Sequence, residues 1–262
     1  QGLDGQKFQS DLVKIGLNEN ELKKFFTPFK RLDINLGWNA MKNSLRAHYL
    51  EIYNDKIFLI SGEGKTIYFD KKNLLKEKLS FKNLPNNIET ILDKNNLELV
   101  GIRDLFFHNN KVLISMMVKN EEGITINLYE ADVSFKNLNF KLFFQTKDFW
   151  EYYNVFSGGR IEKFSDDHIL FAVGFADVSG AAQNLSTNLG KILKINVNTK
   201  EHQIISIGHR NPQGLRYLEN ENIIINSEHG PKGGDEINLN LLNNDEKKIK
   251  NYGWDVTSYG TS

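Results

Sequence analysis

The chain lacks several features that would place it in common functional classes. None of its 262 residues is cysteine, which excludes disulfides, thiolate metal sites and cysteine nucleophiles together. Its 33 basic residues balance 33 acidic ones, so the formal net charge is zero. That balance argues against a nucleic-acid partner, because such binding depends on excess Lys and Arg at phosphates. One local basic site stays compatible with it.

Long apolar runs are also missing. No segment approaches the roughly 20 apolar residues that a membrane-spanning helix needs, so the sequence predicts no membrane association. The chain opens with Gln1 and shows no basic and apolar leader of the secretory type. A cleaved precursor and a trimmed chain would both begin in this way.

The residues that are present indicate two regions. Hydrophobic residues make up 40% and charged residues 25% of the chain, which is ordinary for a globular protein. Short helical spacing occurs at 11–15 and 20–26. We therefore expect a helical or irregular arm over 1–46 and a β-rich domain over 47–262.

The β-rich region consists of short strand-like runs joined by Asn, Asp, Gly and Lys turns. The runs pair as four predicted hairpins, each followed by more strand-forming sequence: 49–60, 105–117, 160–173 and 215–226. The unit recurs roughly every 50–60 residues, near the spacing of four-stranded propeller blades. A large β-sandwich is the alternative from this pattern alone. The predicted fold class is an all-β propeller.

Strand order predicts where a site would lie. In an antiparallel pair, the loop entering the first strand and the loop leaving the second strand lie at the same end. For the fourth hairpin these loops are 208–214 and 228–236, and for the third they are 156–159 and 174–188. Gly-rich polar loops that converge at one rim are typical of a ligand site.

The first of these loops offers polar side chains with two possible roles each. Arg210 is either a fork that binds an anion in bidentate fashion or a partner in a structural salt bridge. Asn211 either contacts a ligand or bridges its own loop. His209 and His229 have no partner at metal-ligand spacing.

The second loop offers oxygen atoms. Gly230 and Pro231 either present free carbonyls to a hard cation such as Ca²⁺, which prefers oxygen ligands, or form a tight turn. Asp235 and Glu236 either complete a metal site or pair with Lys232.

Taken together these segments form a long ordered signature. Gly-His-Arg-Asn-Pro-Gln-Gly at 208–214 is followed by a hairpin, by Glu-His-Gly-Pro-Lys-Gly-Gly-Asp-Glu-Ile-Asn at 228–238 and by Asn-Tyr-Gly-Trp at 251–254. The signature resembles the soluble glucose/aldose (glucose/sorbosone) dehydrogenases that use pyrroloquinoline quinone (PQQ), a family of six-bladed propellers. Segments 158–161, 182–186, 189–193 and, more loosely, 101–108 match as well. The resemblance covers roughly residues 99 to 256.

The resemblance implies a cofactor and a metal. By it, Arg210 and Asn211 contact the anionic quinone, and the carbonyls of Gly230 and Pro231 hold the Ca²⁺ that polarises PQQ. A guanidinium fork suits the carboxylates of PQQ, and a cation at the quinone makes its carbonyl carbon a better hydride acceptor. The resemblance also implies a sugar substrate, a redox partner protein, and a periplasmic or secreted location.

One departure from the family bears on catalysis. The family's general base, which takes the proton from the sugar hydroxyl, is a His just before the Gly-Arg of the third entering loop. This chain has Phe156 there, and Phe175 where members usually have Asp. A phenyl ring cannot accept a proton. The resemblance therefore predicts a PQQ-dependent sugar dehydrogenase-like protein without the usual base.

Two alternatives remain. The chain is a catalytically inactive propeller that binds a ligand or a protein, or, less favoured, a structural extracellular module with a Ca²⁺-stabilised loop. About four blades can be counted, and the last residues contain no closing strand. We expect four to five blades of the six-bladed type in this chain, with truncation at the C-terminus.

Overall fold

The structure, a computed structural model, describes residues 48–74, 80–151, 156–232, 234–242 and 249–257. The arm expected over 1–46 lies outside the described residues, so the boundary between it and the β-rich domain stays a prediction. None of the helices in the described ranges is long and apolar enough to cross a membrane.

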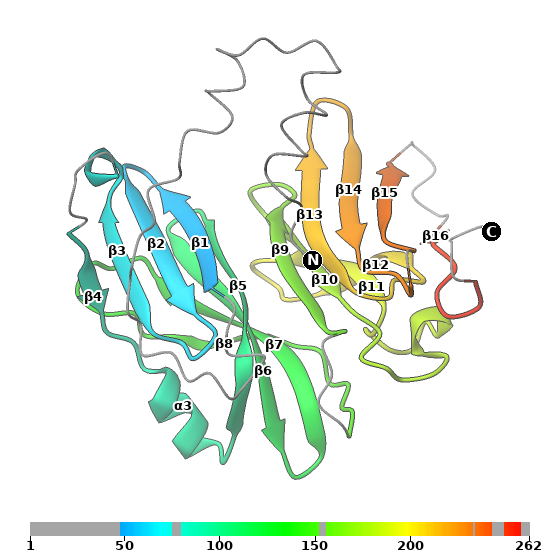
Figure 1. The fold of residues 1–262 in the computed structure, drawn as a ribbon, viewed down its shortest axis with the longest axis horizontal. Coiled ribbons are helices and arrows are strands. Elements are labelled where there is room, and N and C mark those ends of the chain that lie inside the picture. The colour runs from blue at the N-terminus through cyan, green and yellow to red at the C-terminus, as the bar shows by residue number, and fades with distance from the viewer. Residues whose placement is uncertain (1–47, 75–79, 152–155, 233, 243–248, 258–262) are drawn as a thin grey trace, which may run out of the picture. The chain divides into compact units, whose positions relative to one another are not determined.

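The first two sheets each contain four antiparallel strands in chain order (Figure 1). The first is formed by β1 (His48–Tyr53), β2 (Lys56–Ser61), β3 (Thr66–Asp70) and β4 (Lys82–Leu84). A 3-10 turn, η2 (Lys71–Asn73), and a short helix, α3 (Ile88–Lys94), flank β4 in the sequence. The second sheet is formed by β5 (Glu98–His108), β6 (Lys111–Asn120), β7 (Gly123–Asp132) and β8 (Lys141–Gln145).

The next two sheets contain the segments of the predicted rim. The third is formed by β9 (Gly158–Lys163), β10 (His168–Val173), β11 (Lys191–Asn196) and β12 (His202–Ile207), with β16 (Lys250–Asn251) added parallel to β12. The 3-10 turn η3 (Ala181–Gln183) lies in its long 174–190 connection. The fourth sheet is formed by β13 (Pro212–Leu218), β14 (Ile223–Glu228) and β15 (Glu236–Leu241).

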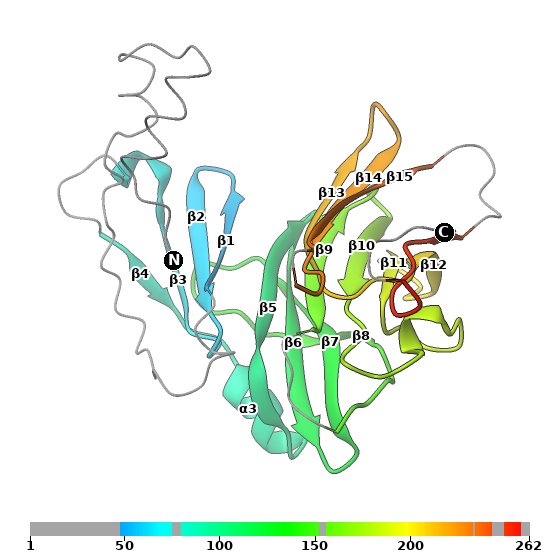
Figure 2. The same ribbon diagram turned by 45° about the vertical axis from the view of Figure 1, so that its right-hand side comes forward.

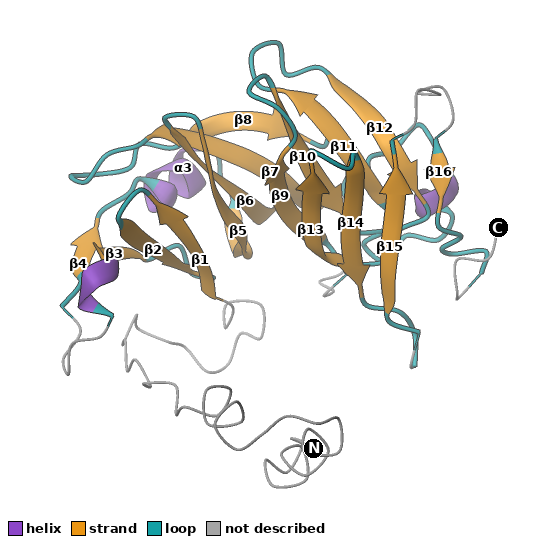
Figure 3. Cartoon of the chain, turned by 90° about the horizontal axis from the view of Figure 1, so that it is seen from above, coloured by secondary structure: helices purple, strands orange, loops and turns teal. Residues whose placement is uncertain are grey.

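The sheets follow one another as propeller blades. Each begins with a strand that lies against the first strand of the blade before it, so that β1 packs beside β5, β5 beside β9, and β9 beside β13. Figures 2 and 3 show this succession from two further directions. The expectation of an all-β propeller is confirmed, with four blades in the part of the chain that the structure describes.

The predicted hairpins are confirmed at their turns. Asn54, Asn109 and Asn222 each have a positive φ, of 55°, 52° and 55°. Asn tolerates this conformation better than most residues, and tight hairpin turns require it. The strands run longer than expected around 98–120. Helix α3 was not predicted.

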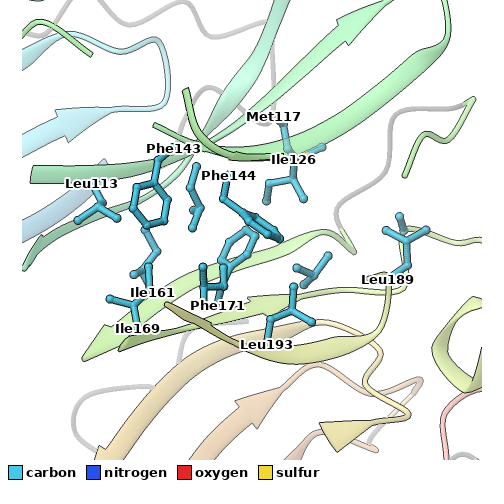
Figure 4. Packing of buried hydrophobic residues seen from close by; sticks show 14 of the residues in the cluster. Leu113, Met117, Ile126, Phe143, Phe144, Ile161, Ile169, Phe171, Leu189 and Leu193 are labelled. Atoms are coloured by element: carbon cyan, nitrogen blue, oxygen red, sulfur yellow. The ribbon is translucent and has the colours of Figure 1, made fainter. Parts of the chain in front are cut away.

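Apolar side chains fill the space between neighbouring blades. In Figure 4, residues of the second blade face residues of the third across one buried cluster. The labelled members are Leu113, Met117, Ile126, Phe143, Phe144, Ile161, Ile169, Phe171, Leu189 and Leu193. Because side chains alternate along a strand, each blade can present such a face to its neighbour.

Ion pairs join the first strands of successive blades. The Asp104 carboxylate on β5 accepts from Arg160 Nη1 on β9 at 2.7 Å and from the Ile161 backbone N–H at 2.7 Å. Glu162 on β9 lies 3.3 Å from Arg216 Nη1 on β13. Burial raises the pKa of Asp104 to about 7, although Arg160 and the Ile161 N–H oppose the shift.

Asp104 should make the stability of the fold depend on pH. The folded state keeps this proton up to about pH 7, whereas an ordinary Asp releases it near 3.8. Its contribution to stability is therefore full below the unfolded pKa and is lost as pH rises through the folded pKa. Between pH 6 and 8 the free energy of unfolding should fall by about 1.4 kcal/mol, and Asp104→Asn should remove this slope. Urea titrations at both pH values test it, with the exposed Asp167→Asn as control. If the free energy of unfolding depends equally on pH in the unaltered protein, Asp104→Asn and Asp167→Asn, the assignment is contradicted.

Candidate functional site

The loops at one end of the third and fourth blades meet through backbone hydrogen bonds. The Phe175 N–H donates to the Arg210 carbonyl at 3.0 Å, and the His229 N–H donates to the Asn211 carbonyl at 3.2 Å. The convergence that strand order predicted is confirmed. It brings together the segments 156–159, 174–190, 208–214 and 228–236.

Arg210 lies where two of these loops touch. Its Nη1 donates to the His229 carbonyl at 2.9 Å and to the Gly230 carbonyl at 3.1 Å. Burial lowers the pKa of its guanidinium, against the opposing effect of Asp177 and other acids. The structure therefore places the cation beside one of the carbonyls that the resemblance assigns to Ca²⁺. Its neighbours are carbonyl groups rather than the carboxylate of a salt bridge.

Two aromatic side chains contact this guanidinium, and a third packs against both of them. Its Cζ lies 4.2 Å from the centre of the Phe156 ring and 5.1 Å from that of Trp254. Phe175 packs against both rings, with centroid distances of 5.8 and 5.3 Å. A guanidinium over an aromatic face is attracted by the ring quadrupole. Phe156, which the resemblance aligns with the family's base, thus contacts the guanidinium that the resemblance assigns to the quinone.

Asn211 is held by its own loop and by the third blade. The side chain is 3% exposed. Its Oδ1 accepts from the Gly158 N–H at 3.2 Å and from Gln213 Nε2 at 2.7 Å. The side-chain oxygen is therefore occupied, and a ligand would be contacted by Nδ2. Asn211 can therefore bridge its own loop and contact a ligand at the same time.

Gly230 and Pro231 form a tight turn. The Pro231 carbonyl accepts from the Gly234 N–H at 2.6 Å, and the Gly230 N–H donates to Asp235 Oδ1 at 3.0 Å. A Cβ on Gly230 would lie 1.7 Å from the Gly234 carbonyl oxygen, so only glycine fits there. His229 Nδ1 is 3.7 Å from Asp235 Oδ1. Among the described residues, no group of three His, Cys, Asp or Glu side chains is arranged to hold a metal.

A buried polar network behind the loops was not found from the sequence. Glu228 Oε1 accepts from His209 Nδ1 at 3.0 Å, and His209 Nε2 lies 2.8 Å from Ser206 Oγ. Burial alone would raise the pKa of Glu228. His209 and the loop N–H groups outweigh it, and the pKa lies below its ordinary value. The only sequence signal was that His209 and Glu228 belong to the two matching motifs.

This network has the hydrogen-bond order of a Ser-His-acid triad. However, Ser206 and His209 are 0% exposed and Glu228 is 5% exposed. A nucleophile must contact its substrate, and the Ser206 side chain on β12 is fully buried. The geometry excludes hydrolysis at this serine and leaves a structural role.

A small cavity lies between Arg210 and residues of the segment 252–257. Its volume is about 10 Å³, room for about one water molecule. Four residues on its wall carry a buried polar atom without a hydrogen-bond partner in the described structure: Arg210 Nε, Tyr252 Oη, Trp254 Nε1 and Thr257 Oγ1. Two of these atoms can only donate and the other two are hydroxyls. The wall therefore suits an acceptor such as a water oxygen. Glu228 and Glu236 also line the cavity, and their charge disfavours an anion there.

Known proteins resemble the chain in sequence over part of its length. It is 34% identical over 116 residues to aldose sugar dehydrogenase YliI of Escherichia coli (strain K12), a match covering 39% of this chain and 30% of that protein.

Solved structures resemble it in fold. A glucose dehydrogenase crystal structure matches with a TM-score of 0.65 and 21% identity, over 82% of this chain and 65% of that one. The PQQ-bound aldose sugar dehydrogenase of Streptomyces coelicolor matches with a TM-score of 0.59 and 18% identity, over 82% and 63%. The chain thus spans less than two thirds of each of these relatives.

The family described as Glucose / Sorbosone dehydrogenase matches residues 52–262. This range begins near the end of β1 and includes the rest of the four blades and every rim loop described above. The chain therefore belongs to the glucose/sorbosone dehydrogenase family.

Proposed function

We propose that this chain is a PQQ-binding, aldose dehydrogenase-like protein whose catalytic base has been replaced by Phe156. Arg210 and Asn211 would bind the anionic quinone, and the carbonyls of Gly230 and Pro231 would bind Ca²⁺. The observation that carries the proposal is the 3.1 Å separation between Arg210 Nη1 and the Gly230 carbonyl oxygen. It supports the proposal because the guanidinium that would bind the anion and the oxygen that would bind the cation lie side by side.

The residues present fit an anionic cofactor. None of the described residues accepts from Arg210 Nη2, which is therefore the group that could bind an anion. Arg210 Nε also has no acceptor but is buried. The cavity behind the guanidinium holds one water at most, so a quinone carboxylate would approach from the side that faces solvent. Charge-assisted hydrogen bonds of this kind are about twice as strong as neutral ones.

Ca²⁺ fits only together with that anion. The Pro231 carbonyl already accepts from Gly234, and the Gly230 carbonyl accepts from the positively charged Arg210. Each oxygen keeps a second lone pair. A divalent ion at Gly230 would be repelled by the guanidinium unless a carboxylate neutralised it. We therefore expect Ca²⁺ and the quinone to bind together rather than separately.

When bound, PQQ would supply a hydride acceptor for oxidation of the sugar. The chain's own contribution is to orient the cofactor through Arg210 and to exclude water with the aromatic wall of Phe156, Phe175 and Trp254. Phe156 offers no group that accepts the hydroxyl proton, so turnover should be slow. The proposal includes an aldose as substrate, a redox partner protein as electron acceptor, and a periplasmic or secreted location.

A second candidate function is a catalytically inactive propeller that binds a ligand or a protein. The contact that favours it is the 4.2 Å stacking of Arg210 on the Phe156 ring, which satisfies the cation with an aromatic face. The scaffold would then be retained for binding alone.

Titration of the protein with PQQ and Ca²⁺ tests the proposal. The absorbance of PQQ should shift on binding, and Arg210→Ala should weaken binding by about 1.5–3 kcal/mol, roughly 10- to 100-fold. Arg216→Ala, on the fourth blade away from the loops, is the matched control and should leave binding unchanged. An unchanged affinity for Arg210→Ala would contradict its assignment. If the absorbance does not shift and no aldose supports dye reduction, the quinone proposal fails and the binding module remains.

A further inference from the structure

The loops of the site are held by the carboxylate of Glu228, a residue that is not itself assigned to PQQ or Ca²⁺. Glu228 is the last residue of β14 and immediately precedes His229 and Gly230. Its Oε2 accepts from the backbone N–H groups of Arg210 at 2.8 Å and of Asn211 at 3.3 Å. The Glu228 side chain thus holds the two residues that the proposed function assigns to the quinone. In the sequence it lies two residues before the pair assigned to Ca²⁺.

The other oxygen of the same carboxylate is held from behind. Glu228 Oε1 accepts from His209 Nδ1 at 3.0 Å, from Asn226 Nδ2 at 3.3 Å and from Asn238 Nδ2 at 2.6 Å. Together with the two loop N–H groups these make five hydrogen bonds to one carboxylate. Buried acceptors need such partners because desolvation without them is costly. The network therefore fixes the orientation of Glu228 from two sheet strands and one loop.

We propose that Glu228 is a positioning residue, whose buried carboxylate fixes the backbone of Arg210 and Asn211 and so sets where the guanidinium lies in the quinone site. The inference rests on the proposed function. Without this acceptor the two N–H groups would lose their buried partner, and the 208–214 loop would sample other conformations. An anion would then pay part of its binding energy to order the loop.

A neutral isostere tests the role of the carboxylate. Glu228→Gln keeps the size of the side chain but replaces one carboxylate oxygen with an NH₂ group. Because N–H donors face both carboxylate oxygens, this NH₂ group cannot accept the hydrogen bonds of the oxygen it replaces. The PQQ dissociation constant should rise roughly tenfold. Hydrogen exchange of the peptide covering 208–214 should accelerate, while exchange in the β6–β7 core of the second blade should be unchanged. The second readout reports loop order without any cofactor.

Two variants separate positioning from general destabilisation. Glu162→Gln makes the same change at another buried carboxylate, which pairs with Arg216 and, among the described residues, makes no hydrogen bond to 208–214. Ser206→Ala removes the far end of the buried network and leaves both loop N–H bonds in place. Both variants should bind PQQ as tightly as the unaltered protein, and both should show its exchange rate at 208–214.

The outcomes distinguish the inference from the function on which it rests. If the unaltered protein binds no PQQ, the proposed function fails. Faster exchange at 208–214 in Glu228→Gln would then still support the role of Glu228 in ordering this loop. If PQQ binds and Glu228→Gln matches the unaltered protein in affinity and exchange, the inference is overturned. It is also overturned if Ser206→Ala weakens binding as much as Glu228→Gln does. Should Glu228→Gln fail to fold, Asn238→Leu, which removes one donor to the carboxylate, replaces it and should give a smaller change in the same direction.

Discussion

Phe156→His should raise the rate of aldose-dependent dye reduction roughly 10²-fold in protein loaded with PQQ and Ca²⁺, the lower part of the range for a positioned general base. An imidazole at this position can accept the sugar's hydroxyl proton, which a phenyl ring cannot. The Arg210 guanidinium, whose Cζ is 4.2 Å from the present ring centre, would disfavour the imidazolium form. A nearby positive charge lowers the pKa of a histidine, so the base form should dominate at neutral pH.

Steady-state dye reduction with glucose and other aldoses provides the measurement. Phe175→His is the matched control, because Phe175 packs on Phe156 and Trp254 but does not occupy the position that the resemblance assigns to the base. It should give no comparable gain. If Phe156→His binds PQQ normally and still shows no activity, the missing base is not what limits the protein. The binding-module alternative would then be favoured.

Lys191→Met should lower the free energy of unfolding by about 1–3 kcal/mol, the cost of leaving a buried acceptor without a hydrogen bond. Lys191 is 0% exposed, which is rare for lysine. Its ammonium donates to the carbonyls of Ala181 at 2.8 Å, Ala182 at 3.0 Å and Leu189 at 2.6 Å. Methionine approximates the length of the side chain but removes this donor. The Ala181 and Ala182 carbonyls keep backbone donors, Asn184 N–H and Gly208 N–H, whereas Leu189 keeps no other donor among the described residues.

The substitution should also affect the loop that carries Arg210. Ala182 is part of η3, and its carbonyl also accepts from the Gly208 N–H at 3.0 Å, at the start of the loop that carries Arg210. Urea denaturation measures the loss of stability. Lys194→Met, three residues further along β11 and partly exposed, should change it little. No measurable effect of Lys191→Met would contradict the assignment, because it would mean that the Leu189 carbonyl does not need this donor.

Much of the fold could be predicted because its signals are local. Asn54, Asn109 and Asn222 mark hairpin turns, since few other residues accept a positive φ at low energy. The meeting of 208–214 with 228–236 followed from antiparallel pairing, which brings the two loops to one end of the hairpin. Helix α3 escaped prediction because its seven residues are short for periodicity to reveal.

The details of the site could not be predicted in the same way. The motif order indicated that Arg210 and Gly230 belong to one site, but not that the first donates to the carbonyl of the second. The sequence also presents Lys191 and Glu228 as ordinary charged residues. Nothing in their neighbours along the chain indicates that one caps three carbonyls and the other accepts five hydrogen bonds.

The sequence by itself determined the strands, their turns and the family, because each depends on residues close together in the chain or on a motif that can be matched in order. Only the tertiary structure decided which groups are buried and which acceptors the charged side chains use. Those choices depend on contacts between residues far apart in the sequence. Arg210 lies against an aromatic wall and a carbonyl, and Glu228 lies behind it, because separate loops were brought together by the packing of blades.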